Sequence, residues 1–309
     1  MTNKILAIQG NNPKKLNPTS DTSIFLANEA QKKKYKIFYY EPKNLSIIND
    51  KVIAKGFFIK FNYSSNKFYK IIKYEKLNLL KCKFILIRQD PPFNLEYIST
   101  TYILDKIKNN VKIINNPTSI RNISEKLYSS SYQKFMPKTI FTKDIIEIKD
   151  FYKINKKMII KPIYGYGGND IHLIHGSFKN KLIINFIKKH GHIMCQQFLP
   201  NIKHGDKRIF LINGKICGAI SRIPKKGSFL SNMSKGAKPI LTKLTNIEKK
   251  ISNIIAKNLK KENIYFGGID FIDQKLNGDI NVTSPTGLKT YYDLSKINLA
   301  KHFWKGLKA

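Results

Sequence analysis

The sequence predicts an α/β protein whose N-terminal part folds as a doubly wound parallel sheet. Short apolar runs at residues 4–8, 36–40 and 84–87 are separated by segments with helical character. Strands that alternate with helices favour parallel pairing through crossover connections. A chain of 309 residues is long enough for two or three domains, each with its own core.

The first domain is expected to comprise residues 1–121. Asp21 can cap a helix that runs to about residue 34, and Asn49-Asp50 separates two strand-like runs as a hairpin. A helix over residues 97–108 and a strand over 111–114 follow. Ligands of such sheets bind beyond the carboxyl ends of the strands, which is where Arg88 stands, directly after the strand FILI. Asn116-Pro117 marks the end of this unit.

A second domain is expected over residues 122–203. It begins with a helix from about residue 124 to 135 that carries Lys126 in its first turn, and a later strand ends in Lys161-Pro162. The segment 164–170, YGYGGND, allows backbone N–H groups to converge on an anion and can close as a lid. An ordinary turn is the alternative. The segment does not match the P-loop pattern.

The last domain is expected over residues 204–309. Asn213-Gly214 joins two strands, and the loop 224–239 is long enough for a functional flap or for disorder. An amphipathic helix over residues 247–260 should bury one apolar face. Its inward residues are expected to be Ile251, Ile254, Ile255 and Leu259.

The segment 267–287, GGIDFIDQKLNGDINVTSPTG, predicts a second hairpin with a two-residue turn at Asn277-Gly278. Strand side chains alternate between faces, and this register places Asp270, Asp279 and Asn281 on one face. Two carboxylates and an amide oxygen suit a hard cation such as Mg²⁺. A solvated hairpin face with ordinary surface acids is the alternative.

The charge balance is strongly basic, with 56 Lys and Arg against 20 Asp and Glu and a net charge of +36. Such a charge suits nucleic acid or an anionic surface. The lysines are spread along the chain with abundant Ile and Asn, which fits AT-rich codon drift at least as well. Because no nucleic-acid motif is present, we expect no nucleic-acid partner.

The arginines are informative because so few of them occur in this lysine-rich chain. Their planar guanidinium binds carboxylate or phosphate through a fork that lysine lacks, so the surviving positions are candidates for function. They are Arg88, Arg121, Arg208 and Arg222.

The cysteines and the N-terminus indicate the compartment. Cys82, Cys195 and Cys217 form no CxxC pair and are odd in number, which suits free thiols in a reducing environment. The N-terminus lacks the apolar core of a signal peptide, and no run approaches the roughly 20 apolar residues of a membrane span. We expect a cytoplasmic protein without a membrane partner.

Several separate stretches between about residues 84 and 288 resemble the bacterial glutathione synthetases, a family of ATP-grasp ligases. DPPF, GDKR and NVTSPTG are specific in combination, and all four arginines lie inside the matching stretches. These stretches are IRQDPPFNLEYISTTYILD, NNPTSIRNISEKLY, IIKPIYGYGGNDI, QQFLPNIKHGDKRIFLINGK, SRIP and GGIDFIDQKLNGDINVTSPTG.

The resemblance implies an ATP-grasp fold behind the N-terminal sheet domain, and the ligation of γ-glutamylcysteine to glycine. ATP and Mg²⁺ (or Mn²⁺) would be required, and an acyl phosphate would be the intermediate. Relatives form symmetric oligomers, so a homo-oligomer is expected by analogy.

Matching motifs also imply site residues. Nucleotide-binding residues would be Lys126, Lys161, Gly165, Gly167, Gly168, Gln196, Phe198, Leu199 and Asp206. Metal ligands would be Asp270, Asp279 and Asn281. Groups acting on the substrate carboxylate or the acyl phosphate would be Arg88, Arg222, Ser284 and Gly287.

Departures from the family's pattern gather near the substrate rather than near ATP. Gln9-Gly10-Asn11 stands where relatives have Asp-Pro, and Leu230 stands where their flap has Arg. Asp279 replaces the usual Glu, and Lys289-Thr290 replaces Arg-Glu. A ligase with an altered dipeptide or amine, and a decayed ATP-binding protein without ligase activity, therefore remain alternative hypotheses.

Overall fold

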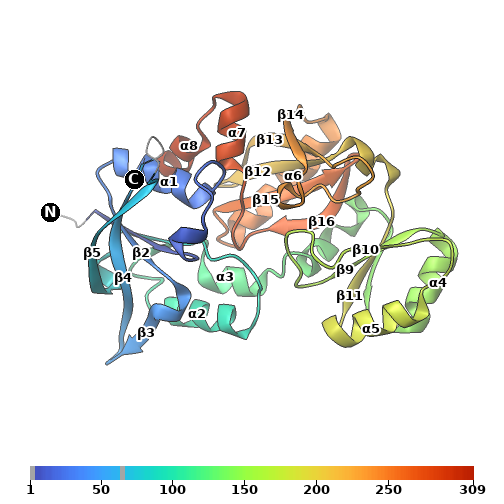
Figure 1. Cartoon of the computed structure of the whole chain (residues 1–309), viewed down its shortest axis with the longest axis horizontal. Helices are drawn as coiled ribbons and strands as arrows, with labels where there is room; N and C mark the ends of the chain where they lie inside the picture. Colours follow the sequence, from blue (N-terminus) through green and yellow to red (C-terminus); the bar gives the residue numbers. More distant parts are fainter. Residues whose placement is uncertain (1–3, 63–66) are drawn as a thin grey trace.

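The computed structural model describes residues 4–62 and 67–309, and it confirms the predicted α/β class. Three sheets lie along the molecule, with the N-terminal sheet at one end and the small sheet that carries α4 and α5 at the other (Figure 1). The sheet formed by the last strands lies between them. Among the described residues, no helix is both long and apolar enough to cross a membrane.

The N-terminal sheet has the order β3-β4-β2-β1-β6-β7, with β5 paired to β4. Strand β1 pairs in parallel with β2 and β6, and β7 pairs in parallel with β6, as predicted. The hairpin at Asn49-Asp50 adds an antiparallel part. The strands are β1 (Ile5–Gln9), β2 (Lys36–Tyr40), β3 (Leu45–Ile48), β4 (Lys51–Phe61), β5 (Tyr69–Asn78), β6 (Phe84–Ile87) and β7 (Lys112–Ile114).

The helices α1 (Thr22–Lys32), α2 (Leu95–Asp105) and α3 (Pro117–Asn122) connect or follow strands of this sheet. Asp21 caps α1 as expected, its carboxylate accepting the Ile24 N–H at 2.8 Å. The helices and loops after β1 and β6 begin at the same edge of the sheet, because Gln9 and Ile87 are paired at the strand ends.

The middle sheet has the order β10-β9-β11-β8 and is entirely antiparallel. Ile148, Ile183 and Phe186 from its two helices pack with residues of the sheet into a separate core. The elements are β8 (Thr139–Thr142), α4 (Ile145–Asn155), β9 (Met158–Pro162), β10 (His172–Ile174), α5 (Asn180–His190) and β11 (Ile193–Gln197).

The helix predicted from about residue 124 to 135 is wrong in type. Residues 127–135 form 3-10 turns with a kink at Tyr132. The segment contains three successive serines, whose hydroxyls compete for backbone groups, and Ser129 Oγ donates to the Lys126 carbonyl at 2.5 Å. This competition disfavours a regular α-helix.

The third sheet has the order β14-β13-β12-β15-β16 and is antiparallel. Helix α6 begins with a capping box between Thr245 and Glu248 and buries Ile251, Ile255 and Leu259 as predicted. Ile254 is 36% exposed, so its predicted burial is wrong. The elements are β12 (Asp206–Ile212), β13 (Lys215–Ile223), β14 (Lys238–Leu241), α6 (Asn246–Lys261), β15 (Phe266–Ile272) and β16 (Lys275–Asn281).

The turn of the β15–β16 hairpin was placed wrongly from the sequence. Ile272 pairs with Lys275, so the two-residue turn is Asp273-Gln274, both with positive φ. Asn277-Gly278 lies instead in an irregularity of β16, opposite the shift between Ile269 and Phe271. An Asn-Gly pair is favoured in both hairpin turns and bulges because both require positive φ, and Gly278 has φ 86°.

Helices α7 (Leu288–Ser295) and α8 (Leu299–Gly306) return to the N-terminal sheet, beside α1 (Figure 1). The buried Trp304 donates its indole N–H to the Leu26 carbonyl at 2.9 Å and lies against Tyr35 and Phe84. Strands of the three sheets fall within the ranges 1–121, 122–203 and 204–309, but this packing joins the two ends of the chain. The division into three domains stays a prediction.

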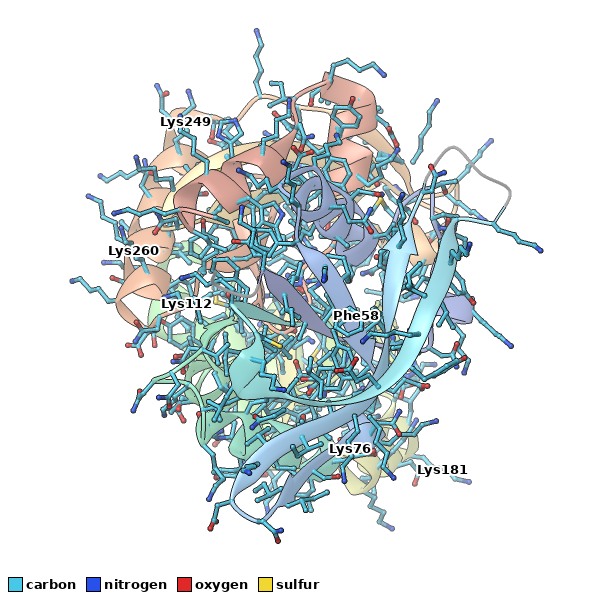
Figure 2. All side chains as sticks on the ribbon, turned by 90° about the vertical axis from the view of Figure 1, so that its left-hand side faces the viewer. Phe58, Lys76, Lys112, Lys181, Lys249 and Lys260 are labelled. Carbon is cyan, nitrogen blue, oxygen red and sulfur yellow. The ribbon has the colours of Figure 1, made fainter. Side chains whose placement is uncertain are left out.

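Lysines project from many elements. In Figure 2 the labelled Lys76, Lys112, Lys181 and Lys249 point outward from strands and helices in different parts of the molecule.

Candidate active site

A cavity of about 730 Å³ lies where the middle sheet, the third sheet and the loops of the N-terminal sheet meet. The glycine-rich loop (residues 164–170) and the flap (residues 224–239) both contribute to its walls. Most of the predicted site residues line it. They are Lys126, Lys161, Gly165, Gly167, Gly168, Asp206, Arg222, Asp270, Asp279, Asn281 and Ser284.

Lys161 is the penultimate residue of β9 and is 2% exposed, yet it lines the cavity. Its Nζ donates to Gln196 Oε1 at 3.2 Å, and to the carbonyl and Oδ1 of Asn277, both at 3.0 Å. Burial lowers the pKa of Lys161, and the negative charge of Asp279 opposes that shift. A neutral oxygen cage around a buried cation leaves it suited to bind an anion.

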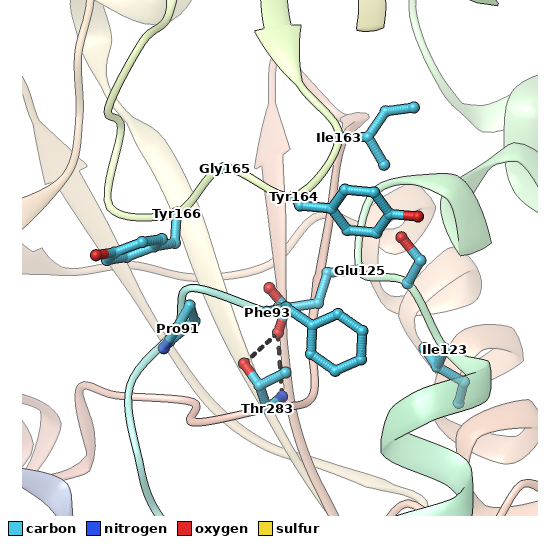
Figure 3. Close-up of a pocket in the computed structure, with 10 residues that line it drawn as sticks. Pro91, Phe93, Ile123, Glu125, Ile163, Tyr164, Gly165, Tyr166 and Thr283 are labelled. Atoms are coloured by element: carbon cyan, nitrogen blue, oxygen red, sulfur yellow. Dashed lines mark hydrogen bonds between the residues drawn. The ribbon is translucent and has the colours of Figure 1, made fainter. Parts of the chain in front are cut away.

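Lys126 enters the cavity from the segment before the 3-10 turns, and its neighbour Glu125 fixes that segment to the end of β16. The Glu125 carboxylate accepts the N–H groups of Val282 and Thr283 at 2.9 and 3.0 Å, and the Thr283 hydroxyl at 2.8 Å. Figure 3 shows Glu125 and Thr283 joined in this way beneath the glycine-rich loop. Lys126 Nζ then lies 2.5 Å from the Gly165 carbonyl and 3.4 Å from Asp279.

Four buried charges from neighbouring strands form a paired network at the cavity floor. Arg222 forms a two-pronged ion pair with Asp206, and its guanidinium also lies 3.0 Å from Asp270. Arg208 forms a second two-pronged pair with Asp270. These four side chains lie on β12, β13 and β15, whose register brings them side by side.

The two carboxylates of this network differ in their pKa shifts. Burial would raise the pKa of Asp270, but Arg208 and Arg222 outweigh that effect and hold it below its ordinary value. Burial dominates at Asp206 and raises its pKa, although Arg222 opposes it. The carboxylate of Asp270 therefore stays ionised and can act as a ligand or a charge partner.

Asp270, Asp279 and Asn281 line the same cavity, as predicted, although the register that brings them together differs from the predicted one. Their donor atoms are carboxylate and amide oxygens, the set that Mg²⁺ and Mn²⁺ prefer. Within the described residues, no group of three or more His, Cys, Asp or Glu could hold a metal ion. The predicted set has only two carboxylates, so it fits an ion that phosphate oxygens also ligate.

The glycine-rich loop and the flap meet over the cavity. Lys235 Nζ donates to Asn169 Oδ1 at 2.7 Å, and Ser234 Oγ donates to the Gly167 carbonyl at 3.5 Å. Gly168 has φ 75°, and a Cβ there would lie 2.4 Å from Asn232 Oδ1. Glycine is therefore required at residue 168 both for the backbone conformation and for the approach of the flap.

Several predicted residues do not line this cavity. Arg88 is 6% exposed, and its Nε donates to Ser23 Oγ at 3.1 Å. The Gly287 N–H donates to Thr22 Oγ1 at 3.1 Å and serves to join α1 to the start of α7. Gln196 accepts a hydrogen bond from Lys161, which does line the cavity. The ring centroid of Phe198 lies 4.3 Å from Lys157 Nζ. Leu199 precedes a 3-10 turn. Roles for these residues toward ligands stay predictions.

Other residues that line or support the cavity were not predicted from the sequence. Arg208 carried a signal, since it is one of the four arginines, but its partner Asp270 is 62 residues away. Asn277 was assigned to a turn, whereas it binds Lys161. Four isoleucines of the cavity wall come from separate parts of the chain and form no pattern in the sequence: Ile159, Ile171, Ile202 and Ile272.

Comparison with known proteins agrees with this geometry. Residues 5–121 match the N-terminal domain of prokaryotic glutathione synthetase, and residues 125–296 match the ATP-grasp domain of the same enzymes. A protein of Brucella melitensis named glutathione synthetase is 34% identical over 98% of both chains. One of the same name from Buchnera aphidicola of Acyrthosiphon pisum is 36% identical over 88% of this chain and 86% of its own.

Solved structures at low sequence identity share the fold. D-cycloserine synthetase DcsG superposes with a TM-score of 0.67 over 98% of both chains at 11% identity. D-alanyl-alanine synthetase A from Vibrio cholerae gives 0.63 over 100% of this chain and 98% of its own at 13% identity. The ATP-grasp ligase PsnB, solved with a minimal precursor, gives 0.67 over 100% of this chain and 99% of its own at 10% identity.

Proposed function

Because this chain belongs to the prokaryotic glutathione synthetase family, we propose that it joins γ-glutamylcysteine to glycine at the expense of ATP. One observation carries the proposal: a single cavity is lined by two buried lysines, by a set of oxygen donors and by the loops of the N-terminal sheet. A ligase of this kind must hold a nucleotide and an acid in one enclosed space.

The nucleotide occupies the part of the cavity between the middle and third sheets. Lys126 and Lys161 bind its phosphates, and the glycine-rich loop covers them with backbone N–H groups. The isoleucine wall supplies an apolar surface for the adenine ring. Asp270, Asp279 and Asn281 hold Mg²⁺ or Mn²⁺, which supplies charge neutralisation at the phosphates when it is bound.

The chemistry proceeds in two steps. A carboxylate oxygen of the cysteine residue attacks the γ-phosphorus of ATP, the bond to the bridging oxygen breaks, and ADP leaves. The glycine amine then attacks the carbonyl carbon of the acyl phosphate, phosphate leaves with its electron pair, and the amine loses a proton. Arg222 lies at the cavity floor, where it stabilises negative charge on the transferring group.

The proposal includes the setting of the reaction. Cys82, Cys195 and Cys217 are free, which suits a reducing cytoplasm where γ-glutamylcysteine stays a thiol. We also expect a symmetric homo-oligomer, which light scattering on the purified protein would measure.

The experiment measures ADP formation by the purified protein with Mg²⁺ and ATP, omitting γ-glutamylcysteine or glycine in turn. We expect sustained ADP formation only when both γ-glutamylcysteine and glycine are present, with glutathione as the product. ADP formation with another pair of acid and amine, and none with this pair, would contradict the proposal.

A second candidate is a ligase with a changed dipeptide or amine. Leu230 of the flap lines the cavity and brings no charge to it. A panel of γ-glutamyl dipeptides and small amines separates the two candidates, because a changed specificity gives turnover only with another pair. ATP binding without ADP formation from any pair would indicate a decayed enzyme.

A further inference from the structure

The end of the cavity formed by the N-terminal sheet has its own set of charges. Asn11 and Lys15 follow β1, Asp21 caps α1, and Asp90 follows β6. Asn11 Nδ2 donates to Asp90 Oδ2 at 2.7 Å, which holds the two loops together. All four residues line the cavity that contains the proposed phosphate site.

Lys15 differs from the other cations of the cavity. Lys126, Lys161, Arg208, Arg222 and Lys235 each hydrogen-bond to a protein oxygen. The side chain of Lys15 is exposed and has no hydrogen bond or ion pair with any residue in the ranges 4–62 and 67–309. It is therefore available to an anionic ligand group.

Asp21 and Asp90 add negative charge to this end of the cavity. Arg88 is a buried guanidinium whose field reaches both carboxylates. Burial raises the pKa of Asp21, the Ile24 N–H and Arg88 oppose that shift, and Asp90 adds to it. Two carboxylates beside one arginine have an excess of negative charge, which favours the binding of a further cation.

We infer that Lys15, Asp21 and Asp90 form the subsite for the amino-acid head of the γ-glutamyl substrate. Lys15 binds its α-carboxylate, and the two aspartates bind its α-ammonium. The inference rests on the proposed function and deepens it.

The subsite is tested with three substrates that differ only in the head group. They are γ-glutamylcysteine, 4-aminobutanoyl-cysteine, which lacks the α-carboxylate, and glutaryl-cysteine, which lacks the α-ammonium. For the wild-type protein we expect kcat/KM to fall by about 10-fold to 100-fold with each truncated substrate, as for the loss of a charged hydrogen bond.

Variants then assign each contact. Lys15→Met should lower kcat/KM for γ-glutamylcysteine to the value for 4-aminobutanoyl-cysteine and leave the latter unchanged. Lys14→Met is the matched control, because Lys14 is the exposed neighbour that does not line the cavity. Asp21→Asn and Asp90→Asn should reduce discrimination against glutaryl-cysteine. The Asn side chain keeps an acceptor for the α1 cap.

The outcomes separate the two proposals. Wild-type turnover of γ-glutamylcysteine with glycine tests the proposed function. If that turnover occurs, two results would overturn the subsite alone. One is an equal change of kcat/KM for γ-glutamylcysteine in Lys15→Met and Lys14→Met. The other is a Lys15→Met variant that still prefers γ-glutamylcysteine over 4-aminobutanoyl-cysteine as strongly as the wild type does. KM for ATP should stay within about twofold in all these variants, since additivity holds for distant sites.

Discussion

The two ends of the cavity are built in different ways. At the phosphate end, Lys161, Arg208 and Arg222 are buried, and each is held by partners from other strands. At the opposite end, Lys15 is exposed in the 3-10 turn Pro13–Lys15, and Asp90 is exposed in a loop. Buried, paired charges are expensive to desolvate but have a fixed geometry, which phosphoryl transfer requires.

A substitution is expected to have different consequences at the two ends. Leu230 lines the cavity from the flap and brings no charge to it. A change to Asp270 would instead leave two buried arginines with an incomplete set of partners. Removing residues from each end should therefore give effects that differ in kind and in size.

The largest effect is expected for Asp270→Asn, which removes the charge partner of two buried arginines. Breaking a buried ion pair from one side typically costs about 3–5 kcal/mol. Urea unfolding at pH 7 should show a loss of this order. Asp293→Asn is the control, because Asp293 lies on the exposed surface of α7.

The same variant gives a pH test. The arginines lower the pKa of Asp270 in the folded protein, so its stabilisation is present above the pKa of the unfolded chain, about 3.9, and is lost as the pH falls through the folded value. The difference between wild type and Asp270→Asn should shrink below about pH 4. A constant difference from pH 7 to pH 3 would contradict this account.

Lys161→Met should lower kcat/KM for ATP by about 100-fold to 1,000-fold, because a preorganised cation is lost from the phosphate site. Steady-state kinetics with saturating γ-glutamylcysteine and glycine measures the effect. Lys188→Met removes an exposed lysine of α5 and should have no effect beyond about twofold. Similar kinetics for the two variants would exclude Lys161 from the phosphate site.

Asp279→Asn should raise the Mg²⁺ concentration that gives half-maximal activity by about 10-fold to 100-fold, as expected when a ligand charge is removed. A Mg²⁺ titration at fixed ATP measures this shift. Asp273→Asn is the matched control, because Asp273 lies exposed in the turn of the same hairpin. An unchanged titration in Asp279→Asn would place the metal elsewhere.

A substitution at the contact between the glycine-rich loop and the flap should give the smallest effect. Gly168 and Gly176 have φ of 75° and 73°, but only Gly168 faces the flap residue Asn232. Gly168→Ala and Gly176→Ala therefore share the backbone strain and differ in the flap contact. We expect kcat/KM for γ-glutamylcysteine to be about threefold to tenfold lower in Gly168→Ala than in Gly176→Ala.

Thermal unfolding of both glycine variants completes that comparison. Their melting temperatures should fall by similar amounts, because the strained conformation is common to both. If the two variants have equal kcat/KM values, the approach of the flap to the glycine-rich loop has no role in turnover.

Local sequence patterns predicted several strands, one helix cap and the residues that share one strand face. The parallel strands β1, β2, β6 and β7 and the cap of α1 by Asp21 were predicted from apolar runs and capping chemistry. The three oxygen donors were also predicted to share a face, and they line one cavity. Strand positions are local properties, so the sequence can reveal them.

Features that depend on distant partners could not be predicted in this way. The hairpin turn was assigned to Asn277-Gly278 by its residue types, whereas the register is set by the packing of β15 and β16. The pairing of Arg208 with Asp270 joins two strands across 62 residues. That the Lys15 side chain has no hydrogen-bond or ion-pair partner within residues 4–62 and 67–309 emerges only from the three-dimensional structure.

The most direct test of the acyl phosphate route follows an oxygen atom. γ-Glutamylcysteine labelled with ¹⁸O in its cysteine carboxylate is converted with Mg²⁺, ATP and glycine, and the phosphate released is analysed by mass spectrometry. We predict one labelled oxygen in each phosphate, because that oxygen forms the bond to phosphorus and leaves with it. Glutathione formed with unlabelled phosphate would contradict the acyl phosphate route and the role given to this cavity.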